Sequence, residues 1–262
     1  MMHNDPTRRT ISGLTQEIGL RIIHSYRLGL QVAWTIPAVL ASVAIIELIQ
    51  HVVEIRIGMF DSLSAAKHLQ HAAIRSYIGL SKVFALWLTA LLIARFWANG
   101  RSLRQALRVP SQAAIRLIAG IAGTMALSSA VATTLEPIFG ASSATLSAIV
   151  PIPILFWAVG SWLDQDRVTL VEAFTTRLID ALILVIVFAA SIPVMQGINI
   201  VIHKAVIGQS VATIWLSMTI DALLVVPLGA ALHGSALFSG YRAGPDRRPL
   251  TNPMAPSRRE EQ

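Results

Sequence analysis

The sequence has no cysteine and few charged residues. Without cysteine, the chain cannot form disulfide bonds, thiolate zinc sites or iron–sulfur clusters, and it has no cysteine nucleophile. Only 13% of its 262 residues are charged, whereas 54% are hydrophobic, and the mean hydropathy is +0.63. Ordinary soluble domains are more polar than this, so the composition predicts a membrane protein.

Signatures of nucleotide binding are also missing. The chain contains neither a phosphate-binding glycine loop with its lysine nor a dinucleotide fingerprint, which argues against an ATP-driven pump. The net charge of +7 comes from basic residues dispersed between apolar runs, so we expect no nucleic-acid partner. We expect no catalytic activity and no cofactor. The expected partners are membrane lipids, other membrane proteins and further copies of the chain.

Long apolar runs dominate what is present. A bilayer core about 30 Å thick requires about 20 apolar residues in a spanning helix. Six runs reach this length and predict an all-α, polytopic integral membrane protein. They cover residues 31–49, 77–98, 113–135, 144–163, 181–202 and 211–232. The third run is rich in small residues, so we expect it at the centre of the bundle.

The basic residues predict the orientation. Most of the 21 lysines and arginines fall in the N-terminal segment, the connections after the second and fourth runs, and the C-terminal tail. Because such residues accumulate on the cytoplasmic side, both termini are expected there, as in a multi-pass protein of a bacterial cytoplasmic (inner) membrane. The basic residues on the opposite side are Arg56, Lys67, Arg75, Lys82 and Lys204.

The two ends of the chain differ from the six runs. Residues 1–30 predict a cytoplasmic segment with an amphipathic interfacial helix over residues 10–30, in which Glu17 pairs with Arg21. Residues 31–235 form the predicted transmembrane domain. Residues 236–262 become rich in proline and arginine and predict a disordered, basic cytoplasmic tail.

Two segments look alike and suggest an internal repeat. Residues 102–107 (SLRQAL) match residues 169–174 (TLVEAF), and each segment precedes a pair of apolar runs. The fold is therefore expected to contain helical-hairpin repeats, although similar hairpins also arise by chance from an apolar alphabet. With its six runs, this layout resembles the membrane domain fused to some bacterial glycerophosphodiester phosphodiesterases and related stand-alone inner-membrane proteins. The resemblance implies a fold and no catalytic residues.

Two sets of ionisable residues are candidate sites. Glu47, His51 and Glu54 share one helix face at the end of the first run, and His68 and His71 follow in the next connection. Their nitrogen and oxygen atoms suit zinc or a similar cation, but no specific zinc motif is present. The sequence therefore favours solvated helix-end residues, with a metal site and a proton-handling role as the alternatives.

Asp221 is the second candidate, because it lies near the middle of the sixth run without a polar neighbour in sequence. A carboxylate at that depth is expected to face the bundle and to find a partner, either as a functional site or as a packing contact. Prolines interrupt four of the runs, as in discontinuous helices that line a cavity: Pro37, Pro151 with Pro153, Pro193 and Pro227.

Three functional hypotheses follow. The first is a small transporter-like or lipid-environment protein that uses Asp221. The second is an intramembrane or outer-face metal-dependent enzyme that uses the cluster of Glu47, His51, Glu54, His68 and His71. The third is a scaffold for a partner membrane protein.

Overall fold

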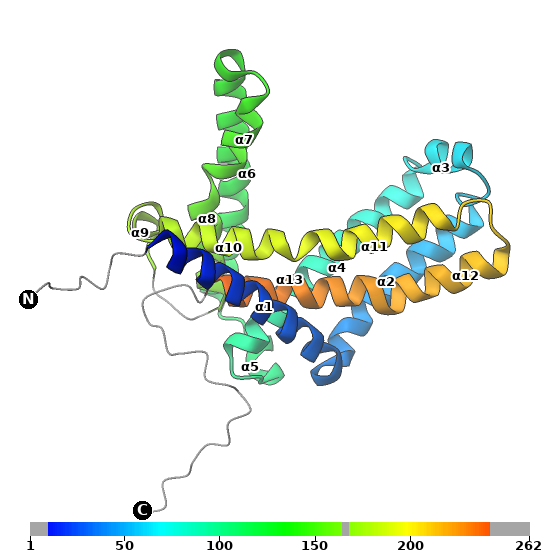
Figure 1. The fold of residues 1–262 in the computed structure, drawn as a ribbon, viewed down its shortest axis with the longest axis horizontal. Helices are drawn as coiled ribbons and strands as arrows, with labels where there is room; N and C mark the ends of the chain where they lie inside the picture. The colour runs from blue at the N-terminus through cyan, green and yellow to red at the C-terminus, as the bar shows by residue number, and fades with distance from the viewer. Residues whose placement is uncertain (1–9, 164–167, 242–262) are drawn as a thin grey trace, which may run out of the picture.

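The protein is a bundle of helices, seen in a computed structural model that describes residues 10–163 and 168–241 (Figure 1). This part of the chain contains no strand, and six of its helical segments are long and apolar enough to cross a membrane. The prediction of an all-α, polytopic membrane protein is confirmed. The helices are α1 (Ile11–Thr35), α2 (Pro37–Arg56), α3 (Leu63–Leu69), α4 (Ala73–Ala98), α5 (Leu103–Leu107), α6 (Ser111–Phe139), α7 (Ser142–Ile149), α8 (Ile152–Leu163), α9 (Leu170–Phe174), α10 (Leu178–Ala190), α11 (Ile192–Ala205), α12 (Val211–Ile220), the π-helical turn η1 (Asp221–Val225) and α13 (Val226–Tyr241).

Three of the six candidate spans are interrupted helices. They consist of α7 with α8, of α10 with α11, and of α12 with η1 and α13. Pro227 explains the π-helical turn, because its missing N–H and its ring disrupt the helix just before it. The expected interruptions at Pro151 and Pro193 are also present. Pro37 differs, because it begins α2 rather than breaking a span.

The first predicted span begins later than expected. A break at Ile36 separates α1 from α2, so the first span is Pro37–Arg56. Helix α1 packs along α13 and α10, and its Arg21 bonds Glu17 as predicted, with an Nη2 to Oε1 distance of 3.0 Å. Arg21 also donates through Nη1 to the backbone oxygen of Ser239 at 2.7 Å.

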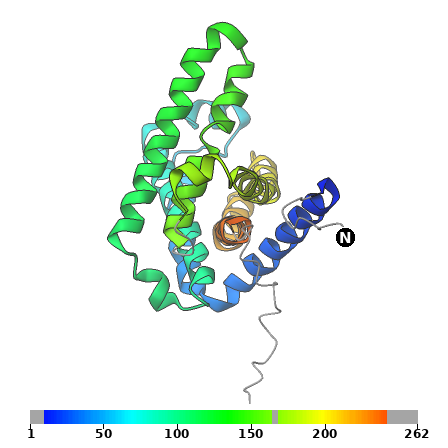
Figure 2. The ribbon, with the colours of Figure 1, turned by 90° about the vertical axis from the view of Figure 1, so that its left-hand side faces the viewer.

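Helix α13 occupies the centre of the bundle, and the expectation that the third run would do so is wrong. Every residue of α13 except Leu228 and His233 is buried, and the helix contacts α1, α4 and α10. In α6 only Ala113, Leu117 and Gly120 are buried. Figures 1 and 2 show α6 and α7 projecting from the rest of the bundle. Both helices are rich in small residues, so small size alone does not identify the central one.

Two short helices occupy equivalent places in the suggested repeat. Ser102 caps α5 and Thr169 caps α9, and each side-chain oxygen accepts from the backbone N–H three residues later. Ala106 and Ala173, which correspond in the two segments, are both fully buried. In α9 the backbone N–H and hydroxyl of Thr169 donate to Glu172 and lower the pKa of its carboxyl. The repeat itself stays a hypothesis.

The transmembrane domain extends beyond its expected boundary at residue 235. Helix α13 continues to Tyr241, and residues 236–241 are buried, so these six residues do not belong to the predicted disordered tail. The remainder of that tail, residues 242–262, lies outside the described residues, as do residues 1–9.

The close contact between α13 and α4 generates a prediction. A Cβ atom added at Gly234 would lie 2.5 Å from the carbonyl oxygen of Ala90 and 2.7 Å from Cβ of Ile93, whereas one added at Gly197 meets nothing within 4 Å. We expect Gly234→Ala to lower the free energy of unfolding by about 1–3 kcal/mol through overpacking. Thermal unfolding in detergent measures this, with Gly197→Ala as the matched control. Equal melting temperatures for the two variants would show that α13 and α4 pack less closely than these distances indicate.

Candidate functional site

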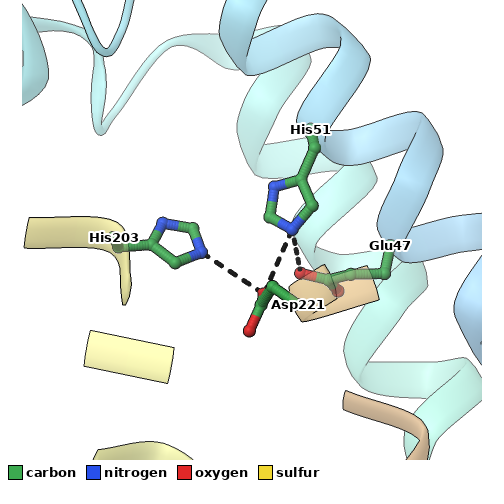
Figure 3. Close-up of side chains that lie close together, drawn as sticks. All are labelled: Glu47, His51, His203 and Asp221. Atoms are coloured by element: carbon green, nitrogen blue, oxygen red, sulfur yellow. Dashed lines mark hydrogen bonds and ion pairs between the residues drawn. The ribbon is translucent and has the colours of Figure 1, made fainter. Parts of the chain in front are cut away.

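The two candidate sites predicted from the sequence form a single cluster. Glu47, His51 and Glu54 lie on the face of α2 that points into the bundle, and Asp221 lies at the start of η1. All four side chains are fully buried. Figure 3 shows three of these side chains converging on one another together with His203 from α11.

His51 is at the centre of this cluster. Its Nε2 lies 3.1 Å from Oδ2 of Asp221 and 3.2 Å from Oε1 of Glu47, and its Nδ1 lies 3.0 Å from Oε2 of Glu54. Both ring nitrogens therefore face carboxylates. Since a neutral imidazole carries only one N–H, this arrangement requires a second proton, on the ring or on a facing carboxyl group, or a cation in place of that proton.

Polar side chains connect the cluster to the α3 end of the bundle. Arg75 donates from Nε to Oε1 of Glu54 at 2.9 Å, and Gln50 donates from Nε2 to the same oxygen at 2.7 Å. The Arg75 side chain is 28% exposed, whereas that of Glu54 is fully buried. Arg75 and Glu54 are each two residues from a helix end, so this contact lies near the boundary of the spans.

The inner part of the cluster lies much deeper. Lys82 donates from Nζ to Oε1 of Glu47 at 2.7 Å, and Asn199 donates from Nδ2 to Oδ2 of Asp221 at 2.8 Å. Nε2 of His203 lies 3.5 Å from the same Asp221 oxygen. Glu47 and Lys82 are each about 13 Å from the nearer end of their helix, at 1.5 Å per residue.

The charges in the cluster do not balance without a further cation. Glu47, Glu54 and Asp221 contribute three negative charges, and Lys82 and Arg75 contribute two positive ones. Oε2 of Glu47 and Oδ1 of Asp221 are buried and have no hydrogen-bond partner among the described residues. Because an unpaired buried charge is costly, the cluster is suited to take up one more positive charge, either a proton or a metal ion.

The structure separates two predicted residues from the cluster and adds others. His68 on α3 and His71 after it are exposed, and neither belongs to the group of ligand atoms formed by Glu47, His51, His203 and Asp221. Whether the two histidines approach the other candidate residues is open from the sequence, and in the structure they do not belong to this group of ligand atoms. His203 is not among the residues predicted from the sequence. It directly follows the fifth run and comes before the sixth run, which contains Asp221.

A cavity of about 420 Å³ begins beside the cluster and lies between α4, α11 and α13. Lys82 and Asn199 line the part next to the cluster, and His233 lines it farther along α13. Neither ring nitrogen of His233 has a hydrogen-bond partner among the described residues. The cavity is mainly apolar, so Lys82 and Asn199 are points at which it meets the charged network.

Comparisons with known proteins give no match. No protein-family model matches the chain, and neither a curated protein nor a solved structure is detectably similar to it. The resemblance to the membrane domain of glycerophosphodiester phosphodiesterases stays a hypothesis about architecture, and the function must be argued from the site.

The hydrogen bond from Asn199 to Asp221 generates a second prediction. We expect Asn199→Ala to lower the free energy of unfolding by about 1.5–3 kcal/mol, the usual range for a hydrogen bond to a charged group. Gln196→Ala is the matched control, because Gln196 lines the same cavity but is exposed. Thermal unfolding in detergent compares the two variants. An equal loss of unfolding free energy in both variants would show that the hydrogen bond from Asn199 to Asp221 does not stabilise the protein.

Proposed function

We propose that the protein is a small transporter-like membrane protein whose buried cluster binds a cation. The observation that carries the proposal is the convergence of Glu47, His51 and Asp221 inside two candidate spans, with carboxylate oxygens that lack a partner. Ionisable groups at such depth are expensive and are typical of ion pathways.

The helix geometry around the cluster supports this proposal. Asp221 begins a π-helical turn, and α11 follows the break between α10 and α11. Interrupted helices at an ion site are a recurrent feature of transporters, because they expose polar backbone groups and provide places where a span can bend. A purely structural ion pair does not need these interruptions.

The cluster is partly exposed at its α3 end, and a transport site needs such access. Arg75 is partly exposed at the α3 end, and hydrogen bonds and ion pairs lead from it through Glu54 and His51 to Glu47 and Lys82. The carboxylates of Glu54 and Glu47 lie along this path, on either side of His51, and offer oxygen atoms to a cation that enters at this end. We propose membrane lipids as the surroundings of the protein and no catalytic activity of its own.

Transport by the cluster is testable in proteoliposomes. We expect the purified full chain to move either protons or Zn²⁺ down an imposed gradient, as measured with trapped pH-sensitive and zinc-sensitive dyes. Asp221→Asn removes a central carboxylate charge, so it should reduce the flux to that of protein-free liposomes. Glu136→Gln, at an exposed position in α6, should leave the flux unchanged. The proposal fails if the unmodified protein shows no flux of either cation.

We further propose that the protein lies in a bacterial inner membrane with both termini in the cytoplasm. The bias of lysine and arginine supports this orientation, and it places the α3 end on the outer side.

Reporter fusions test the orientation. A reporter that is active only in the cytoplasm should be active when fused after Gln262 and inactive when inserted after Asp61, between α2 and α3. The reverse pattern would show that the protein has the opposite orientation, with the exposed end of the cluster facing the cytoplasm.

A further inference from the structure

The cluster contains a complete set of ligand atoms for a metal ion. Glu47, His51, His203 and Asp221 each offer one nitrogen or oxygen, and these four atoms all lie within 4.8 Å of one another. They come from α2, α11 and η1, so the site links three spans. Glu47 and Asp221 are fully buried, and each has a second carboxylate oxygen without a partner.

The spacing of these atoms fits a small transition-metal ion. Zinc binds nitrogen and oxygen at about 2.0–2.2 Å, which places neighbouring ligand atoms of a tetrahedral site about 3.3–3.6 Å apart. The contacts of His51 with Glu47 and with Asp221 measure 3.2 and 3.1 Å, and that of His203 with Asp221 measures 3.5 Å. Modest side-chain movements would bring the remaining pairs to the same spacing.

The surroundings of His51 also fit a metal ligand. Nδ1 faces Glu54 at 3.0 Å, while Nε2 faces the other ligand atoms. A carboxylate that accepts from the non-coordinating nitrogen of a histidine fixes the ring and its tautomer, and most histidine ligands in metalloproteins have such a partner. Glu54 is itself held by Gln50 and Arg75.

We propose that Glu47, His51, His203 and Asp221 bind a divalent transition-metal ion of the zinc class, and that Lys82 competes with this ion for Glu47. This proposal rests on the proposed cation-binding function, and it specifies which cation the cluster binds. Two imidazoles in the ligand set favour zinc, cobalt or nickel over magnesium and calcium, which prefer oxygen ligands alone.

Lys82 is a tethered cation that occupies part of the site when the metal is absent. Its Nζ lies 2.7 Å from Oε1 of Glu47, so the carboxylate is neutralised by the chain itself. When a metal ion binds Glu47, the ammonium must move away, and the adjoining cavity that Lys82 already lines provides room for it. The lysine thereby weakens metal binding and stabilises the empty site.

The number of ligands argues against a catalytic metal site. Catalytic zinc sites commonly use three protein ligands and keep one position for water or substrate, whereas four protein ligands complete a tetrahedron. The four atoms found here would close the site. A metal ion held in this way can be bound and released, but it offers no open position for a reaction.

Metal binding by the purified full chain tests the proposal. After treatment with a chelator, the detergent-solubilised protein is titrated with Zn²⁺ in competition with a fluorescent zinc indicator. We expect one bound ion per chain and no displacement by Mg²⁺ or Ca²⁺. Glu54→Gln should weaken binding by about 10- to 100-fold, because it disturbs the partner of His51. Absence of stoichiometric zinc binding in the unmodified protein overturns the metal site.

Lys82 variants test the competition separately. Lys82→Met should bind zinc about tenfold more tightly, which corresponds to the loss of about 1.4 kcal/mol of competing ion pairing. Without zinc, the same variant should melt at a lower temperature than the unmodified protein. Added zinc should raise the melting temperature of the variant more than that of the unmodified protein. Lys82→Arg should resemble the unmodified protein, and Lys204→Met, at an exposed lysine next to His203, should not change the affinity. Unchanged or weaker binding by Lys82→Met overturns the role of Lys82.

The flux measurements distinguish the two levels of the proposal. Proton flux that depends on Asp221, in a protein that binds no zinc, would retain the cation function and reject the metal. Zinc binding without any flux would retain the metal site and reject transport.

Discussion

The burial of three carboxylates inside an apolar bundle is the constraint on which the rest of the site depends. Glu47, Glu54 and Asp221 have no access to water, and each must be compensated by cations or hydrogen-bond donors because an isolated buried charge is very costly. The compensation comes from two other helices, through Lys82 and Arg75 of α4 and His203 and Asn199 of α11, and from His51 of α2 itself. The cluster therefore links the spans to one another, and it is also the proposed binding site.

The helix packing makes this convergence possible. Small residues at the contacts of α13 allow its neighbours to approach it closely. Gly29 of α1 lies against Leu232 of α13, and Gly234 of α13 lies against Ala90 of α4. Buried Arg95 joins α4 to α5 and α8 by donating to backbone oxygens of Ala106 and Trp162. These contacts fix α4, so that Lys82 and Arg75 are held beside α2.

The sequence predicted the spans better than the site because the two rest on different physics. An apolar run of spanning length can be recognised from its own residues, and all six runs overlap a candidate span of the structure. The shared face of Glu47, His51 and Glu54 was also visible from their spacing. Which helix that face meets depends on tertiary packing, so the sequence alone does not connect Asp221 or His203 with it. His68 and His71 are close to this face in sequence, but they lie in a connection that is exposed.

The two sides of the cluster differ in their exposure, and this difference bears on how the helices would have to move. Toward the α3 end the polar network reaches partly exposed Arg75, whereas in the opposite direction α13 is almost entirely buried. In the proposed transport, a cation that enters at the α3 end would leave by another route, and its release beyond the cluster would require α13 or α11 to move. The interruptions at η1 and between α10 and α11 are the weakest points of these spans, because the regular helical hydrogen bonds are disrupted there. Asp221 belongs to η1, and His203 and Asn199 belong to α11, so movement at either interruption would separate ligands from those on α2. In the proposed transport, bending at these interruptions would move the ligand atoms apart and release the cation.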